Sequence, residues 1–173
     1  PGKNATLETC PYIGKLVTLK GLKYANETFT LIYLNSNLDK KASWNRIFLS
    51  DETWGVTTWA MSKGKMEEYI KTGRWDSCTV GSGGDNFGTV GELKGDGSYP
   101  SIEKAAYSVS QYFKMGNTEI QIRTSGYSKF ADTEIDPDVL AGRKTIDATG
   151  ILTLYQGSVQ FILLDIDGVT VNE

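Results

Sequence analysis

The stretch KTIDATGILTLYQGSVQFILLDIDGVTV, residues 144–171, decides the fold class of this chain. Its two apolar runs, residues 144–155 and 159–171, are joined by Gln156-Gly157-Ser158. Two such runs around a short glycine-containing turn are typical of a β-hairpin. Gly150 lies inside the first run, where a glycine commonly marks a bulge or bend that lets a small sheet curl toward closure. We therefore expect a curved β-structure at this end of the chain.

A second hairpin is expected just upstream. Ile120 and Ile122 alternate with polar residues, which is the two-residue repeat of a strand with one buried face. Residues 108–114 and 118–124 flank a Met-Gly-Asn turn. This arrangement predicts two antiparallel strands.

The first half of the chain carries weaker strand patterns. Apolar and polar residues alternate over residues 16–22, with a bend expected at Gly21. Residues 29–34 either continue this strand or pair beside it. Residues 45–49 and 54–60 indicate strand, turn and strand.

The middle of the chain differs in composition. Residues 62–72 favour a short helix that ends at Gly73, because Met66, Tyr69 and Ile70 are spaced for one face. Residues 78–99 carry seven glycines and indicate a flexible loop. This loop lacks the Gly-Lys-Ser/Thr ending of a phosphate-binding loop, so no nucleotide cofactor is expected.

Residues 12–24, 122–131, 150–157 and 160–165 together resemble the C-terminal half of an uncharacterised family of Bacteroidetes cell-envelope lipoproteins, which is described as OB-fold-like. The resemblance implies an exported protein of the cell envelope, outer-membrane or periplasmic. It also implies that membrane attachment occurs only through a lipid anchor upstream of this sequence. It brings no functional residues, since the activity of that family is not established.

Residues and resemblance together predict one all-β domain over residues 1–173, an OB-like five-stranded Greek-key barrel. The middle of the chain departs from the family pattern, so we expect an insertion at about residues 60–101 that is partly helical and glycine-rich. Cys10 and Cys78 either form a disulfide or are two separate buried thiols.

Charge and composition exclude several function classes. The formal charge of −3 and the pI near 5.1 disfavour nucleic acid as a partner. The absence of histidine excludes Ser-His-Asp and Cys-His catalysis within this chain. The acidic residues around Pro137 lack the spacing of a calcium loop, so no metal site is expected. No carboxylate pair can be assigned a catalytic role from the sequence.

Aromatic residues are the best functional lead. A small barrel needs large side chains in its core, and most aromatic residues are expected there. One or two could instead form an exposed stacking platform for a sugar or a base. The candidates are Trp75 and Tyr99, which have glycine-rich sequence beside them, and Trp59.

The turn after residue 124 has a structural interpretation. We expect Gly126 to permit a sharp turn, Tyr127 and Phe130 to plug the end of the barrel, and Arg123 to pair with a carboxylate. Ser125 has no base to activate it as a nucleophile.

Three functions remain open. The first is a non-enzymatic envelope module for binding or scaffolding, with a glycan as its ligand. The second is oligonucleotide binding, which is common among OB-folds. The third is a hydrolase that uses carboxylates alone. Basic residues beside aromatic residues on one barrel face would favour nucleic acid, whereas a neutral aromatic shelf would favour sugar.

Overall fold

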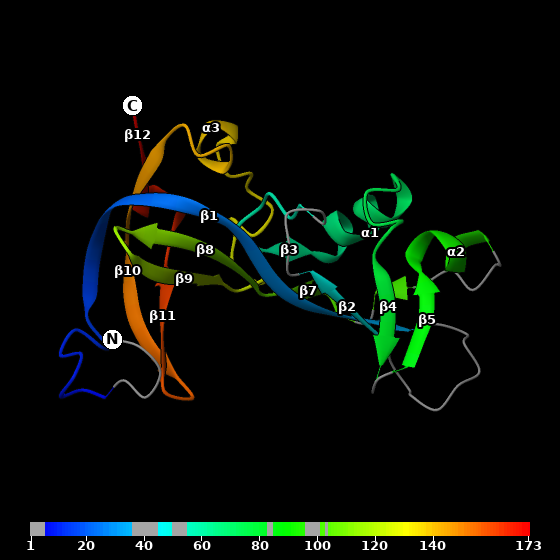
Figure 1. Ribbon diagram of the computed structural model, residues 1–173, viewed down its shortest axis with the longest axis horizontal. Helices are drawn as coiled ribbons and strands as arrows, with labels where there is room; N and C mark the ends of the chain where they lie inside the picture. The colour runs from blue at the N-terminus through cyan, green and yellow to red at the C-terminus, as the bar shows by residue number, and fades with distance from the viewer. Residues whose placement is uncertain (1–5, 36–44, 50–54, 83–84, 96–100, 103) are drawn as a thin grey trace.

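The computed structural model describes residues 6–35, 45–49, 55–82, 85–95, 101–102 and 104–173. It has two lobes, and the long strand β1 (Leu16–Asn35) runs from one into the other (Figure 1). The first lobe is a closed barrel. The second is built by the described residues between β1 and β8 (Val109–Met115).

The barrel has the predicted OB-like topology. Its remaining strands are β9 (Thr118–Thr124), β10 (Thr145–Tyr155) and β11 (Ser158–Leu163). β1 pairs with both β8 and β10, β8 pairs with β9, and β10 pairs with β11, all antiparallel. The parallel pair of β9 and β11 closes the barrel. The order around it is therefore β1, β8, β9, β11, β10, which is a five-stranded Greek-key barrel. Both predicted hairpins are confirmed, except that the second strand of the C-terminal one ends at Leu163 and does not extend to Val171.

Two glycines explain how the barrel closes. Gly21 adopts a φ of 63°, and the pairing of β1 with β10 shifts between Leu19 and Leu22, so the predicted bend is confirmed. Of the bulge or bend expected at Gly150, the bulge is wrong, because strand pairing runs through this residue without a shift. A Cβ there would lie 2.2 Å from the Ile162 carbonyl oxygen. Gly150 is therefore needed for close approach of two strands.

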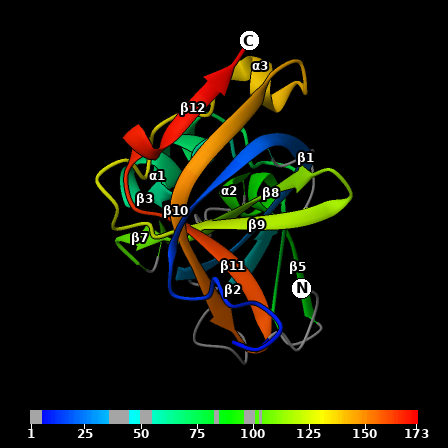
Figure 2. The same cartoon turned by 90° about the vertical axis from the view of Figure 1, so that its left-hand side faces the viewer.

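The barrel interior is filled by side chains from every strand. Its inward residues include Leu22, Phe113, Ile122 and Phe161. Trp59 joins this core from the second lobe. The elements α3 (Pro137–Leu140), η1 (Ile166–Gly168) and β12 (Val169–Asn172) complete this lobe, with α3 and β12 at the same end of it (Figure 2).

The second lobe has its own sheet and core. The far end of β1 pairs with β2 (Asn45–Leu49) and β6 (Ser101–Ile102), and β2 leads to β4 (Thr79–Ser82) and β5 (Asp85–Thr89). A second small sheet joins β3 (Met61–Ser62) to β7 (Ala106–Tyr107). Two helices, α1 (Lys63–Lys71) and α2 (Val90–Gly95), complete it. The segment expected at about 60–101 lies within this lobe, which begins earlier in the chain because β2 already belongs to it.

Predictions for this lobe had mixed outcomes. The helix is confirmed: Ser62 caps α1, and Met66, Tyr69 and Ile70 form its buried face. The flexible loop expected at 78–99 is wrong for its described residues, which after Cys78 form β4, β5 and α2. The strand expected at 54–60 is also wrong, since residues 55–60 contribute only a bridge from Thr58 to Glu134.

Cys10 and Cys78 are both buried and are not bonded to each other, so the interpretation as separate thiols is confirmed. None of the helices in the described parts of the chain is long and apolar enough to cross a membrane.

Candidate functional site

The candidate site lies on the outside of the barrel, across β8, β9 and β11. Side chains alternate along each strand, so Phe113, Ile122 and Phe161 point into the core. The residues between them face outward, and most of these are polar. They are Ser110, Tyr112, Gln121, Arg123, Ser158 and Gln160.

These outward residues form two rows across neighbouring strands. In the first row, Phe29 of β1 lies opposite Ser110, and Ser110 lies opposite Arg123. In the second row, Tyr112 lies opposite Gln121, and the Gln160 amide donates to Gln121 Oε1 at 3.2 Å. Strand register therefore places an aromatic ring at one end of each row and planar polar groups beside it.

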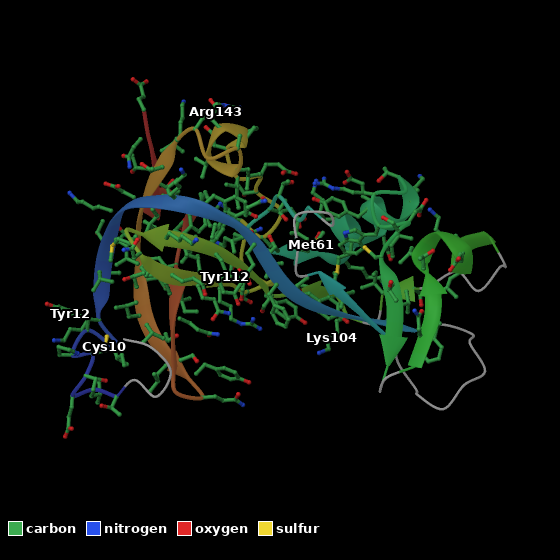
Figure 3. The ribbon with its side chains drawn as sticks, in the orientation of Figure 1. Cys10, Tyr12, Met61, Lys104, Tyr112 and Arg143 are labelled. Atoms are coloured by element: carbon green, nitrogen blue, oxygen red, sulfur yellow. The ribbon has the colours of Figure 1, made fainter. Side chains whose placement is uncertain are left out.

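Two adjoining hollows lie over these rows, and we call them together the outer cleft. They have volumes of about 490 and 370 Å³ and share Phe29 and Arg123. The first hollow is completed by Tyr112, Gln121, Tyr155, Gln156, Ser158 and Gln160. The second is completed by Lys104, Ala106, Tyr107, Ser108 and Tyr127. In Figure 3, Tyr112 lies on the barrel and Lys104 lies toward the second lobe.

Loop geometry holds the rim of the outer cleft in place. Gln156 and Gly157 have φ angles of 48° and 81°, so they form a tight turn of type I′, which matches the twist of β10 and β11. This turn places Tyr155 at the rim with 59% of its surface exposed. An exposed tyrosine beside polar amides suits contact with a partly apolar ligand.

The loop after β9 forms the other rim. A Cβ on Gly126 would lie 2.4 Å from the backbone nitrogen of Tyr107, so glycine is needed for close approach to β7. The following Tyr127 is 76% exposed, and the expectation that it plugs the barrel is wrong; Phe130 is buried as expected. Tyr127 instead borders the second hollow.

The buried hydroxyl of Ser110 positions two polar side chains of the outer cleft. Ser110 Oγ accepts from Gln121 Nε2 at 2.8 Å and from an Arg123 guanidinium nitrogen at 3.3 Å. Among the residues that the structure describes, no carboxylate forms an ion pair with Arg123, so the expected pairing is wrong.

Tyr112 is held in its neutral form. Its pKa is raised chiefly by burial, and further by the charges of Glu27 and Glu119, while Arg123 acts in the opposite direction. Its hydroxyl is therefore available as both a donor and an acceptor of hydrogen bonds at neutral pH.

The residues expected to form a stacking platform are not in this cleft. Trp75 is 0% exposed and Trp59 is 2% exposed, so neither offers a face to a ligand, and this expectation is wrong for both. Trp59 closes the barrel by stacking on Phe113 at a centroid distance of 6.0 Å. Trp75 packs edge-on against Tyr69 in the second core. Tyr99 lies outside the described residues.

The acidic residues near Pro137 have local structural roles. Asp136 caps α3, Asp138 pairs with Arg143, and Asp132 accepts from the backbone and the hydroxyl of Ser62. Within the described ranges, no three acidic or cysteine side chains converge on a point where they could hold a metal ion.

Sequence reasoning missed most of the outer cleft. Phe29 and Tyr155 lie within predicted strands and were not assigned a binding role, and neither were the glutamines of the cleft. Their signal was the alternation along the two hairpins, which gives the outward positions once the strands are assigned.

In comparisons with known proteins, no family model, no curated protein and no solved structure matches this chain.

Proposed function

We propose that this chain is a non-enzymatic binding module and that it holds a glycan in the outer cleft. The observation that carries the proposal is the mostly neutral lining of the cleft, in which aromatic rings alternate with side-chain amides and hydroxyls.

The chemistry of the lining suits sugars. Aromatic faces such as those of Phe29, Tyr112 and Tyr155 can pack against the C–H face of a pyranose ring. The amides of Gln121 and Gln160 can both donate to and accept from sugar hydroxyls. A cleft with mixed apolar surface and a few placed polar groups is typical of a small-ligand site.

The position of the cleft adds support. In OB barrels, the face of the second and third strands and the loops that flank it bind oligosaccharides and oligonucleotides. β8 and β9 are the second and third barrel strands, and the turn between β10 and β11 is one of the flanking loops. Fold analogy alone is weak evidence for function, so the proposal depends on the side chains.

A binding role without catalysis fits the described lining. Neither hollow is lined by an Asp, Glu or Cys among the described residues, so the cleft offers no carboxylate pair of the kind that glycosidases use. Following the resemblance to envelope lipoproteins, we further propose that the module works in the cell envelope.

Oligonucleotide binding is the second candidate. Arg123 and Lys104 lie in the cleft beside aromatic rings, which is the combination that single strands use. The net charge of −3 opposes it, because phosphate backbones need a broadly basic surface.

The test is a binding screen with two matched tyrosine variants. The protein is applied to a glycan array, and in parallel to a labelled single-stranded oligonucleotide at low and high salt. Tyr155→Ala removes a cleft tyrosine that is 59% exposed, whereas Tyr12→Ala removes a tyrosine outside the cleft that is 58% exposed. Glycan binding that is lost in Tyr155→Ala and kept in Tyr12→Ala supports the proposal.

Two results would contradict it. Glycan binding that is unchanged in Tyr155→Ala would place the site elsewhere. Salt-sensitive oligonucleotide binding without any glycan binding would favour the second candidate.

A further inference from the structure

We propose that the ligand of the outer cleft is an acidic glycan, and that Arg123 binds its anionic group. This inference rests on the proposed function and adds the charge class of the ligand and its orientation in the cleft.

Arg123 lies where an anion would meet both parts of the cleft. It lines the two hollows together with Phe29, and these two residues end the same row across β1, β8 and β9. Its side chain is half-buried, so its charge has lost part of its hydration. A ligand bound in either hollow therefore lies next to this side chain.

The contacts of Arg123 orient the guanidinium without neutralising it. A guanidinium carries five N–H donors. One of its nitrogens donates to Ser110 Oγ, which is an uncharged acceptor fixed by burial and by its bond to Gln121. In the described part of the chain no carboxylate pairs with it. The remaining donors are thus available to a carboxylate or sulfate, which guanidinium groups bind with two parallel hydrogen bonds.

Nearby charges make the two ends of the outer cleft electrostatically different. Glu27 and Glu119 act on Tyr112, so the end of the first hollow that contains Tyr112 is unfavourable for an anion. Lys104 adds positive charge at the second hollow, with its ammonium 5.6 Å from the centre of the Tyr107 ring. We therefore place the anionic group at Arg123 and the uncharged sugar faces along Tyr112 and Tyr155.

The test compares three forms of one oligosaccharide by titration calorimetry with the unmodified protein. The forms contain a uronic acid, the same residue with its carboxyl reduced to an alcohol, and the reduced form carrying a sulfate. The uronic-acid form should bind roughly tenfold to a hundredfold more tightly than the reduced form. Addition of salt should weaken only the charged forms. The sulfated arm distinguishes a requirement for a carboxylate from a requirement for any anion.

Variants then assign the effect to Arg123. Arg123→Gln should remove the discrimination, so that the uronic-acid and reduced forms bind the variant with affinities within about twofold of each other. Arg123→Lys keeps the charge but loses the planar fork, so its discrimination should fall between those of the unmodified protein and Arg123→Gln. The matched control is Arg143→Gln, because Arg143 lies beside α3 and away from the cleft (Figure 3).

The experiments distinguish failure of the acidic-ligand proposal from failure of the glycan-site proposal. Equal binding of the acidic and reduced forms, with no effect of Arg123→Gln and a loss in Tyr155→Ala, would overturn the acidic ligand and keep the glycan site. Equal binding that also survives Tyr155→Ala would overturn both. The comparison of ligand forms on unmodified protein remains decisive if Arg123→Gln fails to fold.

Discussion

Replacement of Gln111 by methionine should destabilise the protein more than any other single change of a polar side chain proposed here. Gln111 lies on β8, points inward and is fully buried. Its amide nitrogen donates to the carbonyl oxygens of Val56 at 2.8 Å and Thr58 at 3.0 Å. Its amide oxygen accepts from Thr28 at 2.7 Å and Tyr24 at 3.2 Å. One side chain therefore joins the barrel to the second lobe.

The magnitude follows from what methionine leaves behind. Thr28 and Tyr24 lie 3.1 Å apart by their hydroxyl oxygens, so they can still hydrogen-bond to each other. The two carbonyl oxygens at Val56 and Thr58 lose the donor that Gln111 supplies. Each buried acceptor without a donor costs about 1–3 kcal/mol, which gives roughly 2–6 kcal/mol for the pair. This is a large part of the roughly 5–15 kcal/mol that stabilises a typical domain.

Urea unfolding followed by circular dichroism measures this free energy. The matched control is Gln121→Met on the neighbouring strand, where the glutamine faces the outer cleft and water can replace its partners. We expect the control to cost about 1 kcal/mol or less. Equal losses for Gln111→Met and Gln121→Met would refute the reasoning, because burial of the orphaned carbonyls would then carry no penalty.

Two further predictions concern other contacts. Gly126→Ala should lower the melting temperature sharply, because its Cβ would lie 2.4 Å from the Tyr107 backbone; a calorimetric scan that matches the parent protein would show that the loop simply moves. The pKa of Asp147 is lowered, first by a hydrogen bond from Asn172, so its folded-state pKa lies below the unfolded value of 3.8. The stability that it contributes is present above the unfolded pKa and is lost as pH falls through the folded pKa. Asp147→Asn should flatten this acid dependence, and an unchanged curve from pH 5 to pH 2 in urea unfolding would speak against it.

The barrel could be predicted because its signals are local. The hairpin of β10 and β11 shows a glycine turn between two apolar runs, and Gly21 marks its bend within β1. Periods and turns of this kind depend on a few neighbouring residues, and a single sequence displays them directly.

The second lobe was harder to predict, because its glycine-rich sequence also contains residues of a buried core. Residues 78–99 were interpreted as a loop from their composition, yet Cys78 and Val80 alternate with more exposed residues and Val90 and Leu93 are buried. The prediction of tryptophan as a ligand platform was wrong for a related reason. A large aromatic side chain suits both a ligand platform and a core, and only the tertiary packing showed that Trp75 fills a core.

The outer cleft could not be predicted because it depends on contacts between distant parts of the chain. Phe29, Ser110 and Arg123 form one row only because β1, β8 and β9 adjoin in that register. Gln160 reaches Gln121 only because β11 pairs in parallel with β9, and parallel pairing leaves no turn in the sequence to reveal it.

The second lobe also affects the proposed binding site. Two of its contacts with β8 and the loop after β9 bear on the outer cleft: Gln111 binds the segment around Val56 inside the barrel, and Gly126 packs against the Tyr107 backbone outside it. Tyr107 and Lys104 form the wall of the second hollow that faces Arg123. The segment that Gln111 holds leads into β3, which pairs with β7 at Met61 and Tyr107. Both contacts therefore restrain this wall, so packing sets the width of the hollow before a ligand binds. A preformed cleft loses less conformational entropy on binding, so Gln111→Met should weaken the proposed glycan binding, although Gln111 points into the barrel and away from the outer cleft.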